Sequence, residues 1–201
     1  MAIETEDRRA GDGALMARLG RGETAALEVL IERHGRKLYG FLLRLCGAKD
    51  RAEDVYQEVW MRIMRSAANY NSRDRFEAWM FTVARNLVID EARKTGRRKE
   101  DRLEGPEEDE GLSTLDREPD PGPTPEDEAR GKELGAALEE ALAALNPEQR
   151  EVFLMRERAG LSFDEIAKAT KTPLNTVKTR MHYALGHLRK TLVGRGFITE
   201  G

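Results

Sequence analysis

The chain has 201 residues, of which 39% are hydrophobic, 35% are charged and 6% are aromatic. An ordinary globular domain is about 45–50% apolar and about 25% charged, so this composition disfavours one large apolar core or an all-β sandwich and favours small helical domains with solvated faces. The formal net charge of −3 hides an uneven distribution, because an acidic middle segment separates two mildly basic blocks.

Membrane spans, secretory signals, disulfides and metal sites are not expected. No stretch approaches the roughly 18 apolar residues of a membrane span, and the polar start of the chain lacks the apolar core of a secretory signal. Cys46 is the single cysteine, which excludes an internal disulfide and leaves a zinc site short of ligands. His34, beside Gly35, is expected to be a surface or helix-capping residue rather than a metal ligand. We therefore expect a protein of the reducing cytoplasm with no membrane insertion, no metal and no cofactor.

Charge and proline content divide the chain into two domains and a linker. The net charge is +2 before the middle segment, −8 within it and +3 after it, and the middle also holds five of the seven prolines. A segment with so few periodic apolar residues cannot bury enough surface to offset its chain entropy. The expected organisation is a disordered N-terminus (1–13), a first domain (14–95), an acidic flexible linker (96–129), a second domain (130–195) and a tail (196–201).

Apolar residues recur at helical spacing in the first domain and predict helices over about 24–45, 50–68 and 76–93. The second of these helices has a wide apolar face, to which Met64 is assigned, and an opposite polar stripe. Phe76 and Trp79 open the third helix, and we assign them to core packing because they belong to its apolar stripe.

The second domain is also predicted to be helical. Asn146 followed by Pro147, and Ser162 followed three residues later by Glu165, are typical capping patterns at helix N-termini. Two short helices around a tight turn, the second with Thr172 as its expected cap and Pro173 at its first position, have the arrangement of a helix-turn-helix. The predicted helices cover about 134–145, 147–158, 162–169 and 173–190, so the fold class is all-α.

The last of these helices has an apolar and a polar face. The residues expected to point inward are Val177, Met181, Leu185, Leu188 and Leu192. The outward face carries donors and an aromatic ring that suit base edges in a major groove, and arginines that suit phosphates. We therefore assign DNA contact to Thr176, Lys178, Thr179, Arg180, His182, Tyr183 and Arg189.

Two motifs, in order along the chain, resemble a known family. Bacterial extracytoplasmic-function sigma factors have an N-terminal module similar to RAEDVYQEVWMRIMR followed by FEAWMFTVARNLVIDEARK, and a C-terminal promoter-reading module similar to LSFDEIAKATKTPLNTVKTRMHYALGHLRK. The resemblance covers about 14–95 and 130–192. It implies a non-catalytic protein that binds core RNA polymerase, directs it to one class of promoter DNA and helps to open the strands. Many members are held inactive by an anti-sigma protein, which is a further candidate partner.

The polar stripe of the second predicted helix is where the resemblance places polymerase binding. Its residues follow i, i+3, i+4, i+7 spacing, which puts them on one helix face. In the family the corresponding helix grips a coiled coil on the largest polymerase subunit. The implied polymerase contacts are Asp54, Gln57, Glu58 and Met61.

Recognition of the −10 promoter element is assigned by the resemblance to the NYNSRDR run and the helix after it. Holding a base flipped from the melting strand takes a pocket and a positive backbone track. Asp90 on this face is unfavourable to phosphate and is expected to pair with Arg93 or Lys94. The implied −10 contacts are Asn69, Tyr70, Asn71, Ser72, Arg73, Arg85, Asn86 and Arg93, and the recognition-helix residues above become the −35 contacts.

Some alternatives stay open. The linker is long and acidic for this family, in which it threads the active-site cleft and RNA exit path of the polymerase. Its charge would favour that basic path, and the alternative is a solvated tether. A regulator with only the helix-turn-helix has no need of residues 50–93, and a decoy for an anti-sigma protein would have lost its DNA-facing elements. No phosphate-loop, dinucleotide or nucleophile motif supports an enzyme.

Overall fold

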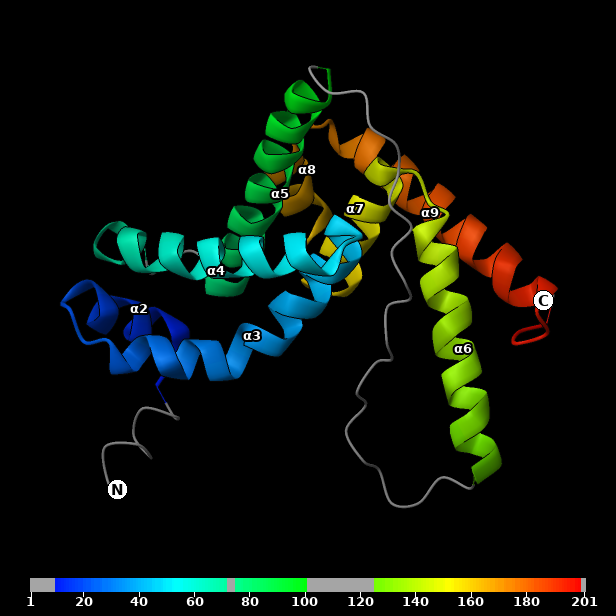
Figure 1. Cartoon of the computed structure of the whole chain (residues 1–201), viewed down its shortest axis with the longest axis horizontal. Coiled ribbons are helices and arrows are strands. Elements are labelled where there is room, and N and C mark those ends of the chain that lie inside the picture. Colours follow the sequence, from blue (N-terminus) through cyan, green and yellow to red (C-terminus); the bar gives the residue numbers. More distant parts are fainter. Residues whose placement is uncertain (1–9, 72–74, 101–124, 200–201) are drawn as a thin grey trace.

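A computed structural model describes residues 10–71, 75–100 and 125–199 of the chain, and within these ranges the regular structure is entirely helical (Figure 1). The all-α prediction is therefore confirmed. The described helices reach a little into the segment expected as linker, because one continues to Glu100 and the next begins at Pro125. The rest of that segment, and the −10 candidates Ser72 and Arg73, lie outside the described residues.

The N-terminal domain consists of α2 to α5. Its helices are α2 (Asp12–Gly20), α3 (Ala25–Cys46), α4 (Lys49–Ser66) and α5 (Phe76–Glu100), with a short 3-10 turn, η1 (Ala67–Asn69), after α4. Helix α2 was not predicted, although it buries Leu15, Met16 and Leu19. Helix α3 passes through Gly35 without a break and ends at Gly47, whose φ of 73° is left-handed and therefore suits glycine.

The C-terminal domain consists of α6 (Pro125–Ala143), α7 (Pro147–Glu157), α8 (Phe163–Thr170) and α9 (Leu174–Gly194). The caps predicted at Asn146 and Ser162 are present, whereas the cap predicted at Thr172 is wrong, because Pro173 occupies the N-cap position of α9 and no side chain caps this helix. The Asn146 side chain accepts a hydrogen bond from the Gln149 backbone N–H, and Ser162 and Glu165 form a complete capping box at the start of α8. Helices α8 and α9 are the predicted helix-turn-helix.

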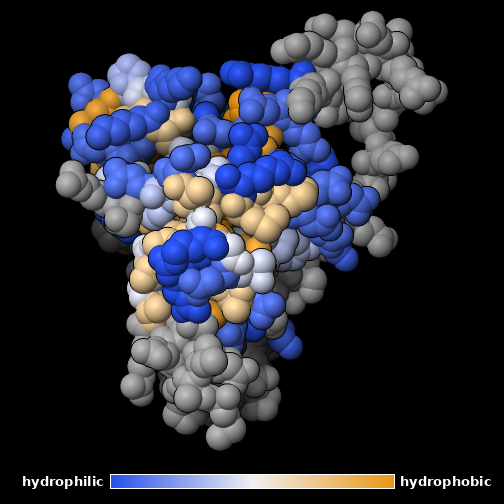
Figure 2. Space-filling view, turned by 90° about the vertical axis from the view of Figure 1, so that its left-hand side faces the viewer, coloured by the Kyte–Doolittle hydropathy of each residue, from blue (hydrophilic) through white to orange (hydrophobic). Residues whose placement is uncertain are grey.

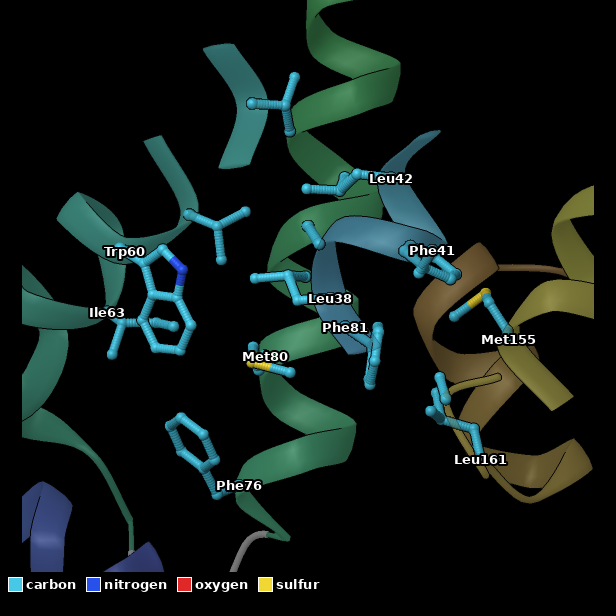
Figure 3. Close-up of a cluster of buried hydrophobic side chains, with 14 of the residues drawn as sticks. Leu38, Phe41, Leu42, Trp60, Ile63, Phe76, Met80, Phe81, Met155 and Leu161 are labelled. Carbon is cyan, nitrogen blue, oxygen red and sulfur yellow. The ribbon is translucent and has the colours of Figure 1, made fainter. Parts of the chain in front are cut away.

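The two domains share one hydrophobic core. Phe41 of α3 and Phe81 of α5 point toward Met155 of α7 and toward Leu161, which follows α7 (Figure 3). All four side chains are fully buried within one cluster of apolar residues. Phe41 and Phe81 meet edge to face with ring centroids 4.9 Å apart, a favourable aromatic geometry. The C-terminal domain is therefore packed against the N-terminal domain rather than held only by the linker.

Side-chain placement differs from the predictions at particular positions. The buried stripe of α9 is Val177, Met181, Ala184 and Leu188, so the inward assignment of Leu185 is wrong, and its side chain is 48% exposed. Met64 is 45% exposed rather than part of the apolar face of α4. His34 is buried, not superficial, because its Nε2 lies 3.0 Å from the carboxylate of Asp12 and its ring packs against Phe76.

Candidate nucleic-acid and partner interfaces

One face of α4 carries the polar stripe expected from the sequence, which we call the α4 stripe: Asp54, Gln57, Glu58 and Met61. Asp54, Gln57 and Met61 are exposed and Glu58 is half-buried. The opposite face buries Val55, Val59 and Ile63, which fixes the orientation of the helix. Arg65 contacts two members of the stripe. Its guanidinium lies 3.3 Å from the Glu58 carboxylate and 3.9 Å from the Met61 sulfur.

A cleft of about 470 Å³ between α3 and α4 adjoins the α4 stripe through Gln57, and the sequence did not predict it. Gly35 in its lining lets Tyr56 approach α3 closely, because a Cβ at that position would lie 2.6 Å from the hydroxyl oxygen of Tyr56. Tyr39 donates a hydrogen bond of 3.2 Å to Glu53 across the cleft. Burial, and then the Glu53 carboxylate, raise the pKa of Tyr39, so its hydroxyl stays protonated and remains a donor.

The loop before α5 is lined by aromatic rings. Tyr70 is half-buried, with its ring 5.1 Å from that of Trp79 and 6.2 Å from that of Phe76. Phe76 is buried, which agrees with its assignment to the core, whereas Trp79 is half-buried at the edge of the cluster. Asn69 and Asn71 are exposed on either side of Tyr70. The aromatic cluster therefore fixes the start of the segment assigned to −10 recognition.

The polar residues of α5 have different environments. Asn86 is exposed, and the exposed Arg93 lies 4.0 Å from Asp90, as expected from their spacing. Arg85 instead faces the C-terminal domain, where its Nε donates a hydrogen bond of 2.6 Å to the Glu151 carboxylate. Arg85 thus pairs with a residue of the C-terminal domain, although its Nη1 also donates a hydrogen bond of 3.2 Å to Oδ1 of Asn86, another −10 candidate. No local sequence signal indicated Glu151 as its partner.

The outward face of α9 carries most of the residues assigned to the −35 element. Arg180 is the exception among them, because it is half-buried and lies 2.7 Å from the Glu148 carboxylate of α7. The hydroxyl of Thr179 donates to the Asn175 carbonyl of its own helix. The rings of His182 and Tyr183 pack edge to face, with centroids 6.0 Å apart. The exposed members are Thr176, Lys178, Thr179, His182, Tyr183 and Arg189.

Comparisons with known proteins agree with this arrangement. The family model for Sigma-70 region 2 matches residues 30–98, and the model for Sigma-70 region 4 matches residues 135–188. The ECF RNA polymerase sigma factor SigE of Mycolicibacterium smegmatis is 33% identical over 190 residues, which cover 94% of this chain and 70% of that protein. The chain belongs to the extracytoplasmic-function sigma factors. SigL of Mycobacterium tuberculosis is also 33% identical, over 171 residues that cover 85% of this chain and 90% of the relative.

Solved structures share the fold of this sigma factor. The sigma factor RpoE from Bartonella quintana, in complex with the anti-sigma factor NepR, has a TM-score of 0.64 and 22% identity, and the match covers 82% of this chain and 95% of that one. CnrH, in complex with the cytosolic domain of CnrY, has a TM-score of 0.60 and 22% identity, with coverage of 91% and 97%.

Membership of this family gives the function of the chain. It is a sigma factor that binds RNA polymerase and promoter DNA and directs promoter-specific transcription initiation. Among the described helices, none combines the length and the apolar character that crossing a membrane requires. The face of the molecule in Figure 2 is mostly hydrophilic, with small hydrophobic areas between the polar groups.

Proposed function

We propose that the sigma factor divides its work among three surfaces: the α4 stripe binds core polymerase, the loop before α5 together with α5 reads the −10 element, and the exposed face of α9 reads the −35 element. The observation that carries this proposal is that the α4 stripe and the exposed face of α9 each lie opposite a buried apolar face, so their polar residues are held outward on rigid helices. Rigid helices position base-reading and partner-binding groups better than loops do.

The chemistry of each surface supports its assignment. Asp54 and Glu58 give the α4 stripe a negative charge beside an exposed thioether, which suits a helical partner with basic and apolar side chains. Lys178 and His182 on α9 are donors that can reach base edges from a helix in the major groove. The chain itself performs no reaction in this proposal; the polymerase does, and the sigma factor works in the cytoplasm, where polymerase and promoters lie.

Control by an anti-sigma protein is part of the proposal. The solved structures of both relatives contain an anti-sigma factor or the cytosolic domain of one partner protein, CnrY. In both structures a protein that shares the fold of this chain is in complex with a second protein. An anti-sigma partner would therefore be sought among proteins that co-purify with this chain and are displaced by core polymerase.

The test of the proposed function is the double variant Asp54→Arg with Gln57→Ala. Because it places a cation where a basic partner is expected, its affinity for core polymerase should fall by at least about tenfold, since like charges placed opposite each other cost several kcal/mol. The matched control is Glu28→Arg, a charge reversal at an exposed position of α3. Circular dichroism checks folding. If the double variant and the control bind polymerase equally, the α4 stripe is not the interface.

A further inference from the structure

Ion pairs join the two domains, and in each one the arginine belongs to the N-terminal domain and the glutamate to the C-terminal domain. Arg44 of α3 lies 2.5 Å from Glu139 of α6. Arg75, just before α5, lies 3.6 Å from Glu165 of α8. The third pair joins Arg85 of α5 to Glu151 of α7. The C-terminal domain thus presents carboxylates to a basic face of the N-terminal domain.

The pair of Arg85 and Glu151 is the most enclosed of the three. Their side chains are 15% and 8% exposed, and the distance between Nε and the carboxylate oxygen is 2.6 Å. Arg85 also donates a hydrogen bond of 3.3 Å to the backbone carbonyl of Ala169, near the end of α8. A guanidinium surrounded in this way by acceptors of the C-terminal domain has little surface left for another anion.

A carboxylate and a phosphate compete for the same groups on arginine. Both accept the parallel N–H donors of a guanidinium, and both pair with its charge. Arg85 is among the residues assigned to the −10 element, where it would contact the DNA backbone. It can make that contact only when Glu151 has left it.

We propose that Glu151 is an internal counter-ligand for Arg85: while the C-terminal domain is docked on α5, its carboxylate occupies the guanidinium that otherwise binds promoter DNA, so docking and −10 binding exclude each other. This inference rests on the proposed role of Arg85 in −10 recognition. It implies that the free sigma factor binds DNA weakly through its N-terminal domain until the two domains separate.

Removing Glu151 should favour separation. Phe41, Phe81, Met155 and Leu161 hold the domains together by apolar contact. Loss of one member of an enclosed ion pair is nevertheless strongly unfavourable to the docked state, because it leaves the charge of Arg85 buried without its partner. In the separated state, water solvates the same arginine. The substitution therefore acts on the docking equilibrium, which should shift toward separation by about tenfold or more.

The variant Glu151→Gln tests the proposal, with Glu148→Gln as its matched control. Glu148 lies one turn earlier on α7 but pairs with Arg180 inside the C-terminal domain. Fluorescence energy transfer between labels at Glu28→Cys and Lys190→Cys, in a Cys46→Ser background, reports the distance between the domains in the full chain; Glu28 and Lys190 are exposed. A fluorescein-labelled 12-nucleotide single-stranded DNA, titrated at several salt concentrations, reports DNA binding.

We expect Glu151→Gln to lower energy transfer, to tighten DNA binding about tenfold and to steepen the salt dependence by about 0.7, the contribution of one phosphate contact to a single strand. Glu148→Gln should leave the energy transfer unchanged, because its partner Arg180 lies in the same domain. Adding Arg85→Ala to Glu151→Gln should abolish the gain in DNA affinity and let the domains dock again, because no unpaired charge is then buried between them. The charge swap Arg85→Glu with Glu151→Arg should restore docking without restoring DNA binding, which also shows that the interface variants fold.

Two results would overturn the proposed role of Glu151, and the second can also test the −10 role of Arg85 by itself. Unchanged energy transfer in Glu151→Gln would overturn the inference, since the pair would then not control docking. Separated domains with unchanged DNA affinity would also overturn it. In that second case, a loss of affinity on adding Arg85→Ala would leave the −10 role of Arg85 standing, whereas no loss would refute that role as well.

Discussion

The exposed face of α9 should separate into residues that read sequence and residues that only hold the DNA backbone. Lys178 and His182 are exposed on the face opposite the buried Val177 and Met181, so they point away from the domain. Replacing either by alanine should cost about 1–3 kcal/mol on the cognate promoter, which corresponds to about a 5- to 150-fold loss of affinity. Most of that loss should disappear when the −35 sequence is scrambled, because the lost contact is to a base edge.

Arg189 should behave differently, because it is exposed two turns further along α9, where a phosphate is the expected contact. Arg189→Ala should weaken binding to cognate and scrambled DNA alike and reduce the salt slope by about one unit. Lys132→Ala, which removes an exposed charge from α6, is the control for a general loss of positive charge.

The assay is binding of the sigma factor, in complex with core polymerase, to promoter fragments recovered by transcription of genomic DNA, at several salt concentrations. Each fragment is paired with the same DNA carrying a scrambled −35 element. If Lys178→Ala and His182→Ala lose affinity equally on both DNAs, this face of α9 does not read bases, and the helix would have to be rotated about its axis on the DNA.

Gly35→Ala should destabilise the protein by about 1–3 kcal/mol in urea unfolding, because the new methyl group would lie 2.6 Å from the Tyr56 hydroxyl. Adding Tyr56→Phe should recover part of the lost stability, and no recovery would refute the steric cause. Burial raises the pKa of Cys46 to about 11, so the thiolate forms only as the pH rises toward that value. Iodoacetamide at pH 8 should therefore react with Cys46 about a hundredfold more slowly than with an exposed thiol. Equal reaction rates in the folded and the unfolded protein would contradict this. Ser162→Ala should cost about 1 kcal/mol of stability by removing the cap of α8, and a wild-type unfolding midpoint would contradict that. Arg180→Ala should lower the melting temperature as well as DNA affinity, because this arginine also joins α9 to α7; a loss of affinity alone would assign it to phosphate.

Local patterns in the sequence predicted local structure well. The caps at Asn146 and Ser162 depend on residues three positions away, and both are formed. The exposed α4 stripe likewise follows from helical spacing alone. Helix α2 was missed because it has only 9 residues and no side chain caps its start at Gly11. Leu185 was misassigned because the apolar leucine, rather than the small Ala184 beside it, was expected to face the core.

What the sequence could not indicate depends on contacts between distant residues. Arg85 and Glu151 are 66 positions apart. In the sequence, each looks like an ordinary residue on the polar face of an amphipathic helix. Their pairing depends on how α5 and α7 cross, which periodicity does not specify. Phe81 was not assigned to the apolar face of its helix, because it lies on a side of α5 that meets both Phe41 of α3 and the C-terminal domain.

The shared core has a consequence for how the chain holds together once it is cut. The contacts between Phe41, Phe81, Met155 and Leu161 do not depend on covalent continuity between α5 and α6. A protease that cleaves the intervening segment should therefore leave two fragments that migrate as one complex as long as the domains stay docked. The linker would then act mainly by raising the local concentration of one half near the other, and its length would set how quickly the halves reassociate.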